Sequence, residues 1–186
     1  AIIKKIAQKK NIKILDISKK SKKIRQNSLK YTGDFKIKNL TMAIEAIKLC
    51  GLKENLIYKA LKKLKDVSGR LELIRKYPNN IKIFIDYAHT PDALFKTLNL
   101  LLKNYGNNIS LVFGCGGERD KRKRPLMARI ANNICKKIYI TDDNPRNENP
   151  QKIRNRIISG CKRIAIDIGN RKKAITAAIC ELRSSE

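Results

Sequence analysis

The feature that most constrains the fold is an alternation of short apolar runs with amphipathic helical runs between residues 81 and 180. Four β-branched runs, at 81–86, 109–114, 137–141 and 163–167, are each followed by a segment whose apolar residues recur at helical spacing. Connections this short favour parallel strands joined by right-handed crossovers. We therefore predict an α/β fold in which helices cover both faces of an open, mostly parallel sheet.

Turn residues mark the starts of the predicted helices. Thr90 supplies an N-terminal cap, and Pro91 the first residue, of the helix that follows the first strand. Pro125 begins the next helix, and Pro150 begins a third. The apolar residues of the helix after Pro125 that we expect to face the core are Leu126, Ile130 and Ile134. A fourth helix is predicted after the last strand.

The beginning of the chain is less regular. Residues 1–32 are rich in lysine, with one helical start in IIKKIAQKK and one candidate strand at 12–17. Apolar residues at helical spacing then predict one helix that ends at Gly51 and a second over 53–65, with Leu56 on its apolar side.

The chain is strongly basic, with 43 lysines and arginines against 16 acidic residues and a formal net charge of +27. Nucleic-acid binding is one interpretation of this charge. However, the basic residues are spread along the whole chain, and Lys, Ile and Asn, which share A/T-rich codons, are abundant together. Aromatic residues make up 5% and Trp is absent, so few side chains can stack on bases. We expect no specific nucleic-acid partner, only weak, salt-sensitive binding of polyanions.

Composition argues against several other classes. The apolar runs are shorter than the ~18 residues of a membrane span, so we expect no membrane association. The five cysteines form no CxxC pair, which favours free thiols in a reducing cytoplasm. The single histidine, His89, excludes a metal site with several histidine ligands. We expect a cytoplasmic monomer, and, because neither end has the features of a natural terminus, a fragment of a longer protein.

Ligands of open α/β sheets bind beyond the carboxyl ends of the strands, which selects three loops. They are DYAHTPDAL (86–94), GCGGERDKRKRP (114–125) and TDDNPR (141–146). The glycine-rich loop precedes a helix and suits an anion, although it lacks the patterns of known phosphate loops. A tight strand-to-helix turn is the alternative for this loop, and a packing or capping role is the alternative for His89.

TDDNPR places an arginine at the open end of a buried strand. Pro145 fixes its own φ and restricts Asn144, so Arg146 should leave the strand in a defined direction. A planar guanidinium suits a carboxylate, and Asp143 beside it suits an ammonium group. Together they offer what is needed to grip the end of a free amino acid. The alternative is an internal ion pair between Asp143 and Arg146, of little energetic value.

GRLELI, DYAHTPDAL, FGCGGERDKRKRPLMA and TDDNPR, in this order and at this spacing, resemble the Mur ligase family over about residues 33–180. The similarity is greatest to the members that add meso-2,6-diaminopimelate to UDP-N-acetylmuramoyl-L-Ala-D-Glu in peptidoglycan biosynthesis. The resemblance implies ATP-dependent amide synthesis with Mg²⁺, in which ATP phosphorylates the glutamyl carboxylate and the amine of diaminopimelate attacks the acyl phosphate.

The resemblance also implies a domain organisation. Residues 1–69 would be the C-terminal part of the central, ATP-binding domain, and residues 70–186 a Rossmann-like amino-acid-binding domain truncated at its end. The family's G-T-N-G-K-T phosphate loop, UDP-sugar domain and G-K-G-H-E segment are not found in the sequence, so we expect the chain to be inactive alone. The alternative is a stand-alone Rossmann-like module that binds a nucleotide or an amino acid.

Site residues follow from the same resemblance, which assigns no catalytic residue and no metal ligand to the chain. Arg146 is the specificity element, because lysine lacks the distal carboxylate that this arginine would bind. A lost charge-assisted hydrogen bond of ~1.5–3 kcal/mol corresponds to roughly ten- to hundredfold discrimination. The expected diaminopimelate-binding residues are Arg119, Asp143, Asn144, Pro145 and Arg146, and the expected ATP-binding residues are Asn39, Arg70, Asp86 and His89.

Overall fold

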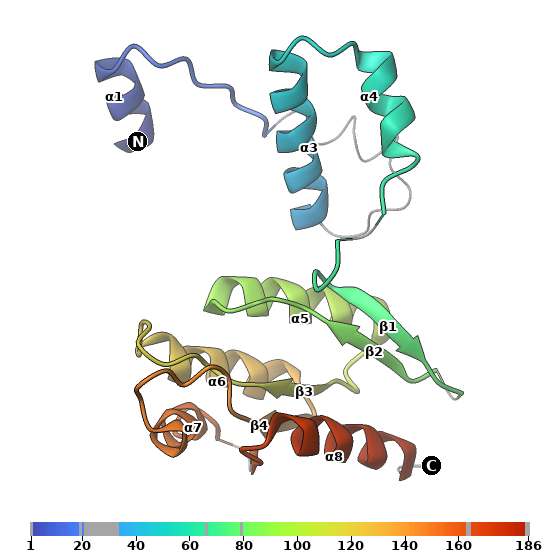
Figure 1. Cartoon of the computed structure of the whole chain (residues 1–186), viewed down its shortest axis with the longest axis vertical. Coiled ribbons are helices and arrows are strands. Elements are labelled where there is room, and N and C mark those ends of the chain that lie inside the picture. Colours follow the sequence, from blue (N-terminus) through green and yellow to red (C-terminus); the bar gives the residue numbers. More distant parts are fainter. Residues whose placement is uncertain are drawn as a thin grey trace. The chain divides into compact units, whose positions relative to one another are not determined.

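The structure is a computed structural model that describes residues 2–18, 20, 34–65, 67–78, 80–162 and 165–184. The chain forms two compact units, Ala1–Lys65 and Asp66–Glu186 (Figure 1). The predicted domain boundary at residue 69, and the assignment of the two parts to different domains of a ligase, stay predictions.

The described part of the first unit is helical, with α1 (Ile2–Lys9), α3 (Asp34–Leu49) and α4 (Glu54–Leu61). The sequence predicts helices at these three places, and the prediction is confirmed. Ile44 of α3 packs against Ile57 of α4, and these two buried side chains form the small core of the unit.

Two details of this unit differ from the prediction. The candidate strand at 12–17 forms no regular structure, and its Ile12 and Ile14 are exposed. A strand needs a neighbour to complete its hydrogen bonds, and the described residues of this unit contain no second strand. On α4 the buried side chain is Ile57 rather than Leu56, which is 54% exposed.

The second unit contains a parallel sheet with the strand order β3 (Ser110–Phe113), β4 (Lys137–Ile140) and β5 (Ile166–Asp167). Phe113 pairs with Ile140, which pairs in turn with Asp167. Each of these residues is the last of its strand, so the three carboxyl ends are level. The predicted parallel pairing is confirmed for these three strands.

The first of the four predicted strands does not join this sheet. β2 (Lys82–Ile85) pairs antiparallel with β1 (Glu72–Lys76) in a separate two-stranded sheet, so its expected place among the parallel strands is wrong. The Tyr77 N–H donates to the Ile81 carbonyl (2.9 Å) and Asn80 adopts φ 61°, which closes a short hairpin. A hairpin joins adjacent residues at a lower entropic cost than a crossover.

The strands of the second unit are connected and covered by α5 (Pro91–Tyr105), α6 (Lys123–Ile134), α7 (Pro150–Ile158) and α8 (Arg171–Ser184). Two of these helices begin as the turn residues predict. The Thr90 hydroxyl accepts from the Ala93 N–H (3.3 Å) ahead of Pro91, and Asn149 Oδ1 accepts from the Lys152 N–H (3.2 Å). Among the described helices, none is long and apolar enough to cross a membrane.

The side chains of β4 point alternately to two layers. Ile138 and Ile140 face a core that they share with α5, α6 and α7. Tyr139, between them, faces the opposite side, where its hydroxyl donates to Glu181 of α8. Helices therefore cover both faces of the sheet, as predicted, and Figure 1 shows α8 on the side away from α5 and α6.

The buried face of α6 agrees only in part with the predicted one, since Ile130 and Ile134 pack against the core as expected. Met127 and Ala131 face the core, together with Arg124, at spacings of three and four residues. Leu126 lies off this stripe and is 42% exposed, so its predicted inward position is wrong. The helix begins at Lys123, and its first turn thus presents an arginine to the interior.

All five cysteines are free thiols. Burial raises the pKa of Cys115 to about 11 and that of Cys135 to about 12. Both thiols are therefore protonated at neutral pH and are poor nucleophiles.

Ile140 and Leu126 provide a test of this packing. Ile140→Ala should lower the free energy of unfolding by about 2–5 kcal/mol, because it removes buried methyl groups and leaves a cavity in the centre of the sheet. Leu126→Ala should cost less than about 1 kcal/mol, since its side chain is largely in solvent. Urea denaturation followed by circular dichroism measures both values, and equal losses would contradict the structure.

Candidate functional site

Two loops leave the sheet side by side because β3 and β4 end at the same level. We call residues 114–122 the glycine loop and residues 141–149 the arginine loop. The Thr141 N–H donates to the Phe113 carbonyl (3.0 Å), and the Gly117 N–H donates to the Asn144 carbonyl (3.0 Å). Main-chain hydrogen bonds thus join the two loops into one surface at the rim of the sheet.

Glycines permit this close approach. A Cβ atom added to Gly114 would lie 2.2 Å from the Thr141 carbonyl oxygen, and one added to Gly117 would lie 1.8 Å from the Pro145 carbonyl oxygen. Neither glycine has a positive φ, so space rather than backbone conformation requires them. The packing of one loop on the other therefore accounts for both glycines without a bound phosphate.

Arg146 lies in the middle of the arginine loop. Its backbone adopts φ 49°, a left-handed conformation that is uncommon for residues other than glycine. The side chain is exposed, and its Nη1 donates to the Gly117 carbonyl at 2.6 Å. The guanidinium is thus directed across the rim toward the glycine loop.

Asp143 and Arg146 do not form the internal ion pair that the sequence leaves as an alternative. Among the described residues, Asp143 lies 3.8 Å from Nη1 of Arg171 and accepts from the Asn144 N–H (3.0 Å), whereas Arg146 takes part in no salt bridge. Asp143 and Arg146 are both exposed. The rim therefore presents an acidic and a basic group to solvent on the same loop.

Arg119 belongs to the same surface. A Cβ atom added to Gly116 would lie 3.1 Å from Nη1 of Arg146 and 4.0 Å from Cγ of Arg119, so both arginines lie against this glycine. Asn144 and Pro145 contribute through their main-chain carbonyls, which accept hydrogen bonds within the rim. The structure thus brings together all five residues that the sequence assigns to amino-acid binding.

Sequence reasoning missed a buried ion pair beneath this surface. Arg124, only 2% exposed, donates to both carboxylate oxygens of Glu148 (3.0 and 2.9 Å) and to the Gly116 carbonyl (3.2 Å). Oε1 of Glu148 also accepts from the Glu118 N–H at 2.5 Å. The hydrogen bonds from Arg124, and after them the one from Glu118, lower the pKa of Glu148 to about 2.

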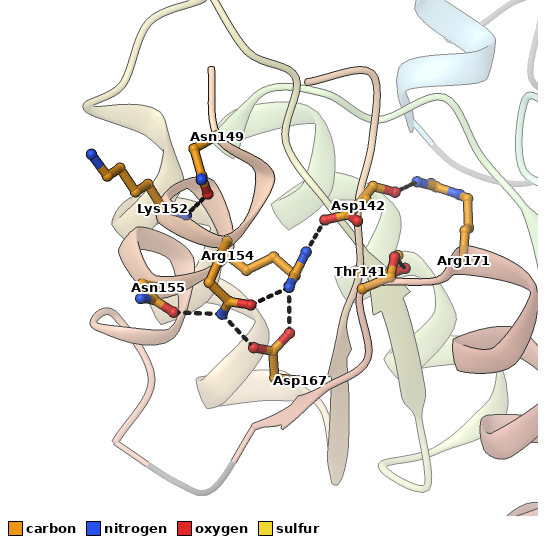
Figure 2. A network of polar contacts seen from close by, with 10 residues as sticks. Thr141, Asp142, Asn149, Lys152, Arg154, Asn155, Asp167 and Arg171 are labelled. Atoms are coloured by element: carbon orange, nitrogen blue, oxygen red, sulfur yellow. Dashed lines mark hydrogen bonds and ion pairs between the residues drawn. The ribbon is translucent and has the colours of Figure 1, made fainter. Parts of the chain in front are cut away.

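A second arginine network holds the start of the arginine loop (Figure 2). Arg154 of α7 forms ion pairs with Asp142 and, through Nε at 2.6 Å, with Asp167 at the end of β5. Arg171 at the start of α8 donates to the Asp142 carbonyl (2.7 Å). Asp142 is thus held from two helices, which gives it a structural role.

The third predicted loop follows β2, and we call residues 86–90 the histidine loop. Oδ2 of Asp86 accepts from the Leu71 N–H (2.7 Å), while its Oδ1 accepts from the Ala88 N–H (2.9 Å) and the Thr97 hydroxyl (3.1 Å). These contacts fix the shape of the loop from within. The predicted contact of Asp86 with a nucleotide stays a prediction.

Tyr87 is exposed and contacts two neighbouring side chains at this loop, with the His89 ring in an edge-on arrangement. The rings of Tyr87 and His89 lie 5.4 Å apart, and Cζ of Arg70 is 4.8 Å from the centre of the Tyr87 ring. Lys123 Nζ donates to the His89 carbonyl (2.9 Å) and so links the histidine loop to the start of α6. Asn39 is exposed on α3 of the other unit, and its nucleotide contact also stays a prediction.

Comparison with known proteins finds a matching family and similar curated proteins. Residues 69–186 match the family model described as "Mur ligase, glutamate ligase domain". The chain is 43% identical over 157 residues to the UDP-N-acetylmuramoyl-L-alanyl-D-glutamate–2,6-diaminopimelate ligase of Rickettsia bellii, and 40% identical over 154 residues to that of Rhizobium meliloti. Each alignment covers 83% of this chain and 32% of the relative, so the chain spans about a third of its relatives' length.

Solved structures agree with these matches. A UDP-N-acetylmuramoyl-L-alanyl-D-glutamate–2,6-diaminopimelate ligase matches with a TM-score of 0.55 and 35% identity, over 79% of this chain and 30% of that one. The folylpolyglutamate synthase of Mycobacterium tuberculosis, complexed with ADP, matches with a TM-score of 0.67 over 82% of this chain and 34% of that one. At 19% identity, the second likeness concerns the fold alone.

Adjacent glycines should respond differently to the same substitution. Gly117→Ala should lower the free energy of unfolding by about 1–3 kcal/mol and shift the amide resonances of both loops, because the new methyl group meets main-chain atoms of Pro145. Gly116→Ala should perturb the main chain of the rim less, since the atom nearest its methyl group is the side-chain Nη1 of Arg146 at 3.1 Å rather than a main-chain atom. Amide NMR spectra and urea denaturation measure both effects, and equal perturbation would contradict the described rim.

Lowering the pH should remove the contribution of Glu148 to the free energy of unfolding within a defined range of pH. Its pKa is about 2 in the folded chain against an ordinary value of 4.5, so the ionised carboxylate stabilises the fold fully above pH 4.5. The contribution is lost as the pH falls from 4.5 toward 2. The difference in unfolding free energy between the wild type and Glu148→Gln, measured in urea at each pH, should shrink in this range. A difference independent of pH would show that Glu148 is not held as described.

Proposed function

Because the chain belongs to the Mur ligase family, we propose that it is the amino-acid-binding part of an ATP-dependent ligase that adds meso-2,6-diaminopimelate to UDP-N-acetylmuramoyl-L-Ala-D-Glu. The family model matches residues 69–186, and relatives named for this reaction are 40–44% identical to the chain. The proposal covers the activity of the whole ligase, its substrates and its place in peptidoglycan synthesis. A cytoplasmic location and a monomeric state are part of the same proposal.

The exposed guanidinium of Arg146 is the observation that carries the proposal. Hydrogen-bonded to the Gly117 carbonyl, and without a salt bridge to any described residue, it keeps its positive charge available to an incoming anion. Asp143, three residues earlier in the same loop, is exposed and offers an acceptor for an ammonium group. The distal end of diaminopimelate carries one carboxylate and one ammonium group, and it therefore fits this pair.

Arg119 supports the same assignment from the facing loop. Its Cγ lies against Gly116, beside the guanidinium of Arg146, so its side chain is long enough to bring a second positive charge to a carboxylate near this glycine. Asn144 and Pro145 keep the main chain of the arginine loop in place through their carbonyls. In this proposal the chain binds and orients the amino acid, and the reacting amine lies at the other end of the substrate.

The histidine loop is the proposed nucleotide contact. Tyr87, His89 and Arg70 form an exposed group of two rings in edge-on contact and one guanidinium, which offers an aromatic surface to a purine and a positive charge to a phosphate. ATP, when bound, supplies the phosphoryl group that activates the substrate's carboxylate. Among the described residues no group of three His, Cys, Asp or Glu side chains could hold a metal ion, so we assign no Mg²⁺ ligand there.

Arg146→Ala tests the proposal directly. We expect the wild-type chain to bind meso-diaminopimelate more tightly than L-lysine, which lacks the distal carboxylate. The variant should lose roughly ten- to hundredfold in affinity for diaminopimelate and little for lysine, because one charge-assisted hydrogen bond is removed. Isothermal titration calorimetry measures both affinities.

Arg129→Ala is the matched control, since Arg129 is an exposed arginine of α6 outside the proposed site. It should leave both affinities unchanged. In the complete ligase, Arg146→Ala should raise the KM for diaminopimelate far more than the KM for ATP. An equal rise in both constants, or equal binding of the two amino acids by the wild type, would refute the proposed specificity.

A further inference from the structure

We propose that the buried Arg124–Glu148 pair positions Arg146 for substrate recognition, and that it acts through the single peptide bond between Gly117 and Glu118. This inference rests on the proposed function, because it assigns two further residues to the amino-acid site. Neither residue is expected to touch the substrate. Their role is to fix the direction of a guanidinium that does.

The first link is that Arg124 donates hydrogen bonds to both loops. Its guanidinium reaches the Glu148 carboxylate of the arginine loop with two hydrogen bonds (3.0 and 2.9 Å) and the Gly116 carbonyl of the glycine loop with one (3.2 Å). The side chain is 2% exposed, so water does not compete for these donors. Arg124 thus fixes the position of the Glu148 carboxylate relative to the glycine loop.

The second link is one planar group held at both ends. Glu148 Oε1 accepts from the Glu118 N–H (2.5 Å), and Arg146 Nη1 donates to the Gly117 carbonyl (2.6 Å). This N–H and this carbonyl belong to the same peptide unit. A trans peptide is planar, and its N–H and C=O point in opposite directions, so the hold of Glu148 on one end sets the direction of the other. The orientation of Arg146 therefore depends on Glu148.

Backbone conformations in both loops agree with this arrangement. Glu118 and Arg146 adopt φ angles of 51° and 49°, a left-handed backbone conformation that residues other than glycine rarely adopt. Such conformations persist where surrounding contacts over-determine them. Here the contacts are the Arg124–Glu148 pair on one side of the peptide and Arg146 itself on the other.

An ion pair in which one partner is buried, as Arg124 is, is a poor source of stability, because desolvation of the buried charge offsets much of the attraction. An apolar pair of similar volume would fill the space but would leave the Glu118 N–H without its acceptor and the peptide free to rotate. The charged pair is thus better explained by the orientation that it enforces.

The test uses Glu148→Gln and Arg124→Lys in the full 186-residue chain, with Arg129→Ala as the control. Both variants should speed amide hydrogen exchange at Glu118 and broaden or shift the guanidinium resonance of Arg146. They should also weaken binding of meso-diaminopimelate about tenfold while changing the affinity for L-lysine less than about twofold. If Arg124→Lys fails to fold, Glu148→Gln alone decides, because Glu148 is partly exposed.

Combination with Arg146→Ala separates positioning from general destabilisation. If Glu148 acts through Arg146, adding Glu148→Gln to Arg146→Ala should cost no further affinity for diaminopimelate. Additive losses, or equal losses for diaminopimelate and lysine, would overturn the inference. So would unchanged exchange at Glu118. A wild-type chain that binds neither amino acid would count against the proposed function, and the exchange and guanidinium measurements would still decide whether the pair orients Arg146.

Discussion

The level ends of three parallel strands are the constraint on which the second unit depends. Phe113, Ile140 and Asp167 are neighbours across the sheet, and each ends its strand. The loops that follow β3 and β4 therefore start side by side, and glycines allow their main chains to approach within hydrogen-bonding distance. Main-chain hydrogen bonds thus join two loops into one surface, on which the Gly117 carbonyl holds the guanidinium of Arg146.

The sequence predicted correctly those features of the fold that depend on residues close together in the chain. The cap at Thr90, the parallel strands after it and the loops at their carboxyl ends follow from residue types within a few positions of one another. The partner of β2 does not, because its apolar alternation suits a parallel sheet or a hairpin equally well. In the structure β2 pairs with β1, because the hydrogen bond from Tyr77 to Ile81 and the left-handed conformation of Asn80 (φ 61°) reverse the chain between the two strands.

In the candidate site, too, the sequence indicated some of the residues and not others. Arg146 stands out in the sequence because turn chemistry accounts for the Asp, Asn and Pro residues around it but not for an arginine. The structure brings it to one surface with Asp143 and Arg119. Arg124 was hidden in the run KRKR, which has the composition of a solvent-exposed segment. Only its spacing from Met127 and Ala131 indicates burial, and that spacing becomes readable once the start of the helix is known.

The scarcity of acidic residues explains how this strongly basic chain can leave particular arginines without an acidic partner, and so available to an anionic ligand. With 43 basic and 16 acidic residues, most positive charges have no acidic residue to pair with. At the rim, the acids hold the arginines that shape the loops: Glu148 binds Arg124, and Asp142 binds Arg154. Arg146 instead rests on a carbonyl, which orients the guanidinium without neutralising it. An arginine directed by a neutral acceptor keeps the charge that an anionic ligand needs, and this distinguishes it from the structural arginines around it.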